Sequence, residues 1–153
     1  MAILELAAEP SLARRESYEL VDTYAPGQGR EVRRISAALL ALWGVAELAE
    51  DFSVIASELC SNARHVAGTF RLTISHRPGV VRIEMQDSSP VIPSIPREMP
   101  AWDAVGGRGL YLVGQYSDAM GVDPIAGGKV IWAECALKGM ETANGRSPHS
   151  SCS

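Results

Sequence analysis

The sequence lacks several features that mark common protein classes. Its three cysteines, Cys60, Cys135 and Cys152, are widely spaced and form no CxxC pair, which argues against a disulfide framework or a zinc site. The net charge is −4, so there is no basic surplus for generic nucleic-acid binding. No apolar run approaches the roughly 18 residues of a membrane span. The N-terminal stretch has neither the basic region nor the long apolar core of a secretory signal. These absences predict a reduced, cytoplasmic globular protein with neither a membrane nor nucleic acid as a direct partner.

The common phosphate-binding fingerprints are also missing. The stretch at 127–129 reads GGK but continues with Val130, so it is not a Walker A loop. The stretch VGGRGLYLVGQ, Val105 to Gln115, lacks the GxGxxG spacing and the preceding strand of a Rossmann fingerprint. It does place three glycines and Arg108 directly before a helix-like run, where free backbone N–H groups can meet an anion. We interpret it as a mobile lid that closes on phosphates, with a merely flexible loop as the alternative.

Hydrophobic periodicity predicts one domain over residues 1–137, with a polar, Ser-rich tail at 138–153 that we expect to be disordered. The expected elements are a strand at 17–24, helices at 30–43 and 51–67, strands at 69–76 and 80–87, an irregular proline-rich segment at 88–107, a helix at 108–120, and closing strands that include the turn and strand at 126–137. Strands combined with helices in this order predict a two-layer α/β sandwich. Its sheet is expected to be mixed and mostly antiparallel, with the helices on one face.

Two further sets of polar residues are candidates for chemistry. Glu58 and Asn62 are four residues apart on one face of the second helix, with His65 near that face. A glutamate can act as a general base and an amide oxygen can bind Mg²⁺, although a solvated helix face is the simpler interpretation. Asp87 ends a strand just before the long segment. It could accept a hydrogen bond from an exocyclic amine such as that of adenine, or it could only initiate a turn.

Taken together in this order, these motifs resemble the GHKL ATPase superfamily, which includes gyrase and the histidine kinases. Within it, the chain is similar to the small anti-sigma-factor serine kinases and to the related ATP-binding regulators of actinomycetes. Residues 56–68 resemble the N box, residues 83–93 the first glycine box, residues 106–113 the second glycine box, and residues 127–135 the closing strand. The resemblance covers Arg30 to Leu137, and it implies the ATP-binding fold of the Bergerat type.

The resemblance also implies roles for individual residues. Asn62 would hold Mg²⁺ between the phosphates of ATP, and Glu58 would orient or deprotonate the attacking hydroxyl. Asp87 would accept the adenine amine. The residues expected along the phosphates are Gly107, Arg108, Gly109 and Leu110. One departure is plain, because the superfamily's Asp-x-Gly is replaced here by Asp87-Ser88-Ser89-Pro90.

The function implied by the resemblance is that of an ATP-dependent anti-sigma factor with protein-serine kinase activity. It would bind a sigma factor and phosphorylate a STAS-type anti-anti-sigma partner, and the resemblance suggests a homodimer. The departure in the first glycine box keeps a second hypothesis open, in which the same fold acts as a binding module with little or no ATP turnover. A detached sensor-kinase domain ranks last, because no phospho-acceptor histidine in a dimerising helical segment accompanies the motifs.

Overall fold

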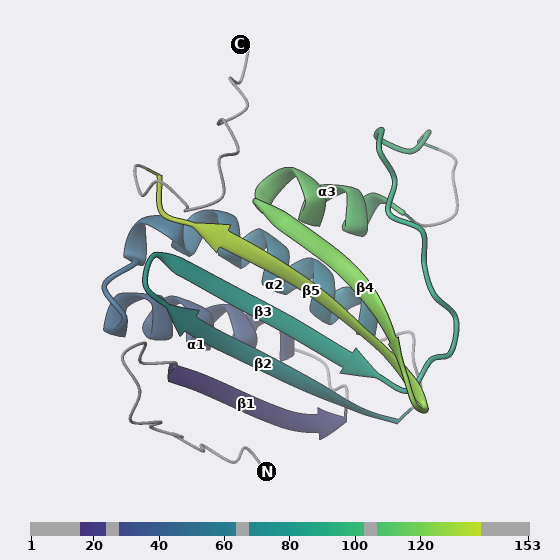
Figure 1. The fold of residues 1–153 in the computed structure, drawn as a ribbon, viewed down its shortest axis with the longest axis horizontal. Helices are drawn as coiled ribbons and strands as arrows, with labels where there is room; N and C mark the ends of the chain where they lie inside the picture. Colours follow the sequence, from purple (N-terminus) through teal and green to yellow (C-terminus); the bar gives the residue numbers. More distant parts are fainter. Residues whose placement is uncertain (1–15, 24–27, 64–67, 103–106, 139–153) are drawn as a thin grey trace.

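Five strands form one open sheet in the computed structural model of the chain, which describes residues 16–23, 28–63, 68–102 and 107–138 (Figure 1). The strands are β1 (Glu16–Thr23), β2 (Thr69–Arg77), β3 (Val80–Asp87), β4 (Ala119–Ile125) and β5 (Gly128–Ala136). Their order across the sheet is β1-β2-β3-β5-β4, and every neighbouring pair is antiparallel. The proline of β4, Pro124, therefore lies on an edge strand, where a missing N–H donor is tolerated.

The helices all lie on one face of this sheet (Figure 1). They are α1 (Gln28–Leu42), the short 3₁₀ helix η1 (Ala46–Leu48), α2 (Ala49–Ala63) and α3 (Arg108–Tyr116). The predicted two-layer sandwich with helices on one face is confirmed, and its described sheet is antiparallel throughout. Within the described residues, no helix is long and apolar enough to span a bilayer. The predicted tail lies outside the described part of the chain beyond Lys138.

The predicted end of the third helix is wrong. The helix expected to run to Met120 ends at Tyr116, because Ser117 adopts an extended conformation with φ −107° and ψ 157°. Met120 instead lies in β4, opposite Ala133 of β5. Met120 is seven residues after Val113, so it continues a helical period by coincidence, and only pairing with β5 distinguishes the two structures.

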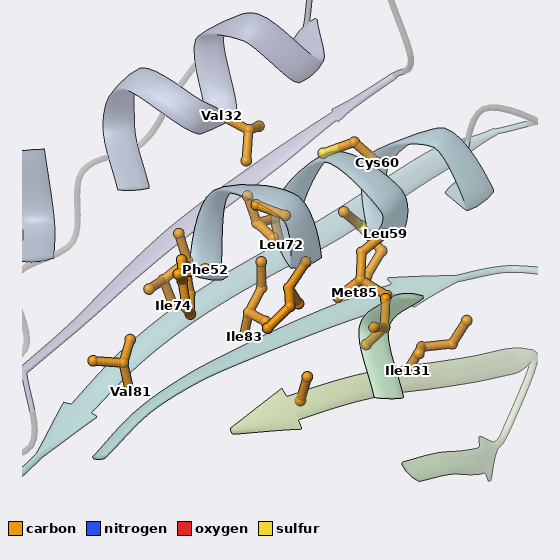
Figure 2. Close-up of a cluster of buried hydrophobic side chains, with 14 of the residues drawn as sticks. Val32, Phe52, Leu59, Cys60, Leu72, Ile74, Val81, Ile83, Met85 and Ile131 are labelled. Atoms are coloured by element: carbon orange, nitrogen blue, oxygen red, sulfur yellow. The ribbon is translucent and has the colours of Figure 1, made fainter. Parts of the chain in front are cut away.

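The core lies between the helices and the inner face of the sheet (Figure 2). Buried and less buried side chains alternate along β2, β3 and β5, and in β3 Val81, Ile83 and Met85 are all buried. Two cysteines belong to this core. Burial raises the pKa of the Cys60 thiol to about 11, and burial with nearby carboxylates raises the pKa of Cys135 to about 12.

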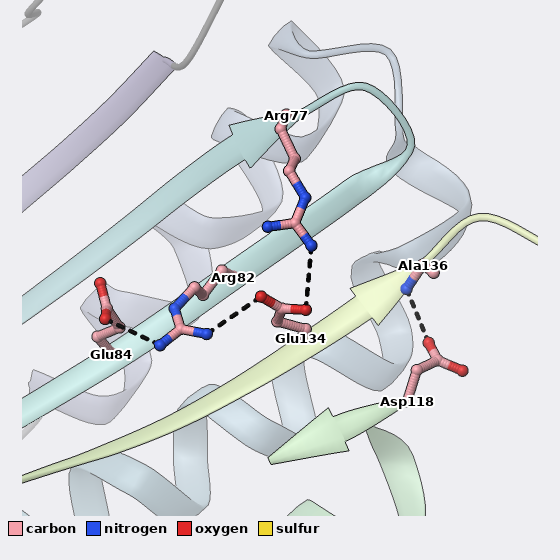
Figure 3. A network of polar contacts seen from close by, with 6 residues as sticks. All are labelled: Arg77, Arg82, Glu84, Asp118, Glu134 and Ala136. Carbon is pink, nitrogen blue, oxygen red and sulfur yellow. Dashed lines mark hydrogen bonds and ion pairs between the residues drawn. The ribbon is translucent and has the colours of Figure 1, made fainter. Parts of the chain in front are cut away.

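The outer face of the sheet carries a network of charged side chains instead (Figure 3). Arg82 bonds to both Glu84 and Glu134 at 3.1 Å, and Arg77 reaches Glu134 at 3.3 Å. The guanidinium of Arg82 also lies 4.3 Å above the ring of Trp132. A surface hollow of about 330 Å³ lies among these residues. Because its arginines are already paired with glutamates, the hollow offers little net charge to a ligand.

Candidate functional site

Glu58 and Asn62 project from α2, the central helix, which packs against both α1 and α3. The adjoining side of α2 is fixed in the core by fully buried residues such as Ile55 and Leu59. Glu58 and Asn62 are half-buried, at the border between the core and the surface. Neither side chain forms a hydrogen bond or ion pair within the described residues. Packing therefore places these two oxygen-bearing groups without using their hydrogen-bonding capacity.

The carboxylate of Glu58 lies against the first turn of α3. A Cβ atom added to Gly109 would stand only 2.7 Å from Glu58 Oε2 and 3.7 Å from its Cδ. A glycine at 109 thus allows the carboxylate to approach the backbone that opens α3. The partial positive charge of a helix N-terminus favours a negative group at this position. Two motifs that lie far apart in the sequence, one on α2 and one at the start of α3, meet here.

The turn into α3 begins at Gly107, which is in the left-handed conformation with φ +88°. A side chain there would be strained. It would also press on Pro96 and Pro100, because a Cβ atom at position 107 would stand 3.3 Å from the Cγ atom of each proline. Gly107 has no side chain, so none caps the first N–H groups of α3. The turn therefore leaves backbone donors near the carboxylate of Glu58.

Arg108 and Leu110 have different surroundings. The exposed Arg108 donates from Nη2 to the carbonyl oxygen of Ala101, at 3.2 Å, and so contacts the proline-rich segment. The Leu110 side chain is buried in the core, which leaves only its backbone available to a phosphate. The expectation that Arg108 and Leu110 lie along the phosphates of ATP remains a prediction. Gly106, from the stretch Val105 to Gln115, and His65, from the motif at 56–68, lie outside the described residues.

Asp87 lies at the end of β3 and is buried in an ion pair with Lys129. The two residues are register partners on β3 and β5. Lys129 Nζ lies 2.8 Å from each carboxylate oxygen of Asp87. The side chains of Lys129 and Asp87 are 4% and 2% exposed. The N–H of Ser89 also donates to Asp87 Oδ1, at 2.9 Å.

Sequence reasoning missed Lys129, although a signal was present. Along β5, Lys129 has the same parity as the buried residues Ile131, Ala133 and Cys135. A lysine in an inward-facing register needs an acidic partner, because an unpaired buried ammonium is very costly. Its partner is Asp87, from a different strand, so the pair is visible only once the register of the two strands is known.

A backbone contact fixes this pair at the start of the proline-rich segment. A Cβ atom on Gly128 would stand 1.9 Å from the carbonyl oxygen of Asp87 and 2.9 Å from Cα of Ser88. Only glycine allows the chain leaving β3 to cross β5 so closely. From there residues 88–102 run along the end of the domain where α2 also ends (Figure 1).

The donor set is compatible with a magnesium nucleotide. Among the described residues, no group of three or more His, Cys, Asp or Glu side chains could hold a metal ion by itself. Mg²⁺ bound to nucleotides usually keeps water and phosphate oxygens as ligands and takes only one or two from the protein. The amide oxygen of Asn62, which has no partner within the described residues, suits that role.

A family model matches most of the chain. The model of the histidine kinase-like ATPase domain matches residues 23–134, which include every residue discussed in this site. No curated protein matches the chain.

Proposed function

The chain belongs to the histidine kinase-like ATPase domain family, which implies that it binds ATP, and from this premise we propose that it is an anti-sigma factor with protein-serine kinase activity. Its substrate is a serine of a STAS-type anti-anti-sigma protein, and its regulatory target is a sigma factor. The proposed kinase activity rests on one observation: the Glu58 carboxylate lies close to Gly109 in the first turn of α3.

In the proposed phosphoryl transfer, each residue of this site has a separate role. The serine hydroxyl of the partner attacks the γ-phosphorus of ATP, the bond from that phosphorus to the β–γ bridging oxygen breaks, and ADP leaves. Glu58 orients the hydroxyl and accepts its proton. The backbone N–H groups after Gly107 bind phosphate oxygens at the start of α3. Asn62 would hold Mg²⁺, which when bound neutralises phosphate charge.

A second function has a specific observation in its favour. Most of the hydrogen-bonding capacity of Asp87 is taken by Lys129 and Ser89 of the chain itself, and the first glycine box reads Ser88-Ser89-Pro90 after it. A domain whose candidate adenine-binding carboxylate is largely occupied in this way can act as a binding module that contacts a sigma factor or a second copy of itself with little ATP turnover. The kinase proposal is preferred because this second function gives no reason for Glu58 to lie beside Gly109.

Mg-ATP and a panel of STAS proteins test the proposal directly. We expect a phosphoserine on one STAS protein, formed by the wild-type chain and lost with Glu58→Gln. Isothermal titration with Mg-ATP on the same samples separates binding from turnover. ATP binding without any phosphoserine would favour the binding module, and absence of both would contradict the whole proposal.

A further inference from the structure

Within the part of the chain that the structure describes, the contacts of Asp87 leave one acceptor position unused. An ionised carboxylate has about four acceptor positions, two on each oxygen. Oδ1 receives the N–H of Ser89 and a hydrogen of Lys129, and the ammonium of Lys129 also lies 2.8 Å from Oδ2, where it occupies a second side of the carboxylate. One position on Oδ2 remains. Both side chains are almost fully shielded from water, so a hydrogen bond formed at this position would be strengthened by the low local dielectric.

The position of this acceptor is fixed by its surroundings. Asp87 and Lys129 are directly opposite in the β3–β5 ladder, so the backbone holds both side chains in one register. The tight crossing at Gly128 holds the chain that follows Asp87. Lys129 contacts both oxygens, which prevents rotation of the carboxylate about its own axis.

We propose that Lys129 is a positioning residue of the nucleotide site. By taking two of the acceptor positions of Asp87, with Ser89 taking a third, it leaves a single, oriented acceptor for one N–H of the base, the exocyclic amine of adenine. The inference rests on the proposed binding of ATP and adds a residue to it. The ammonium of Lys129 also balances the charge of the buried carboxylate, and a hydrogen bond to a charged acceptor is stronger than one to a neutral acceptor.

Nucleotide analogues separate this role from a merely structural one. Purine riboside triphosphate has the ring and phosphates of ATP but no exocyclic amine. Wild-type protein should bind ATP about tenfold to hundredfold more tightly than this analogue, because the amine bonds to a charged group. Lys129→Gln should reduce that preference by about threefold or more. A structural role would weaken both ligands equally and leave the ratio unchanged.

Lys138 provides the matched control. It is the other lysine of the sequence and is exposed. Lys138→Gln should leave both affinities and their ratio unchanged. An unchanged ratio in Lys129→Gln would overturn the inference, as would equal binding of ATP and the analogue by the wild type. In either case the proposed function would survive. Failure of the wild type to bind ATP would overturn both.

A second measurement needs no variant. With ¹⁵N-labelled lysine, the buried ammonium of Lys129 should give an observable NMR signal, whereas the exposed Lys138 exchanges its protons rapidly with water. Saturating ATP should shift the Lys129 signal, and purine riboside triphosphate should shift it much less. Equal shifts with the two nucleotides, or none with ATP, would overturn the inference even if Lys129→Gln does not fold.

Discussion

The two ends of the candidate site differ in how their polar groups are satisfied. At the end of β3, Asp87 and Lys129 are buried and bonded to each other. Glu58, beside the start of α3, and Asn62, one turn further along α2, are half-buried and have no side-chain partner within the described residues. At the first end the two charges are paired as soon as the chain folds. At the second end, packing positions the polar groups and leaves their bonding capacity for a ligand.

This difference has an energetic basis. A charge inside the domain must be paired, because its desolvation costs several kcal/mol, so Asp87 and Lys129 depend on each other for folding. A carboxylate at the border of the core remains partly hydrated and tolerates being unpaired. We therefore expect changes at the first end to affect stability before function, and changes at the second end to affect function before stability.

The largest effect should follow from breaking the buried pair. Lys129→Met leaves Asp87 buried without a cation and should lower the free energy of unfolding by about 3–5 kcal/mol. Urea denaturation measures this. Lys138→Met, at an exposed position, should change it by less than about 0.5 kcal/mol. The double variant Asp87→Leu/Lys129→Met should recover most of the loss, because no unpaired charge remains. A loss below about 1 kcal/mol for Lys129→Met would contradict the pairing argument.

At the other end, two neighbouring substitutions should have different consequences. Asn62→Ala should weaken Mg-ATP binding about tenfold or more, because a proposed metal ligand is lost. Glu58→Gln should leave that affinity within about twofold and lower phosphotransfer about a hundredfold or more, as expected for loss of a base. Titration calorimetry and single-turnover phosphorylation measure the two quantities. Equal loss of binding in both variants would show that Glu58 has a structural role.

A smaller effect is expected from filling the space beside Glu58. Gly109→Ala places a Cβ about where the Glu58 carboxylate lies and should cost about 1–2 kcal/mol of stability. Gly29→Ala, on α1 with nothing within 4 Å of the added atom, should be neutral or stabilising by up to about 1 kcal/mol. In a Glu58→Ala background, Gly109→Ala should cost less than about 0.5 kcal/mol. Additive losses would mean that the two groups do not meet.

The smallest effect concerns the segment at 88–102, which follows the first end and leads toward the second. We expect its amides to exchange hydrogen rapidly without nucleotide and more slowly with Mg-ATP, because four prolines suppress regular structure there. Hydrogen exchange followed by mass spectrometry measures this. The amides of Ile83 and Met85, in the central strand β3, should be protected in both states and serve as the internal control. Full protection of the segment without nucleotide would contradict its role as a lid.

Local patterns were sufficient to predict most of the fold. The spacing of Val32, Leu40 and other apolar residues predicted α1, and the alternation around the turn at 77–80 predicted the β2–β3 hairpin. Boundaries were less accurate, since α2 begins at Ala49 rather than at Asp51. The end of α3 was wrong because Met120 fits both a helix and a strand.

The candidate site residues could be chosen one by one from the sequence, but the contacts between them could not. Glu58 and Asp87 could be selected from their positions on a helix and at the end of a strand. The contact between Glu58 and Gly109 depends on how α2 packs against α3, and the pair with Lys129 depends on the register of β3 and β5. Both are long-range properties, and no local pattern in the sequence encodes them.

The burial of Cys60 and Cys135 makes the domain suitable for site-specific labelling. Maleimide reagents attack the thiolate, and both native thiols are shielded and remain protonated near neutral pH. Trp102, by contrast, has 87% of its surface exposed, on the segment that we expect to move. If Cys152 is replaced by serine, a cysteine introduced at position 102 would react fastest within the described part of the chain. A dye or spin label there would report motion of the segment while every core side chain stays native.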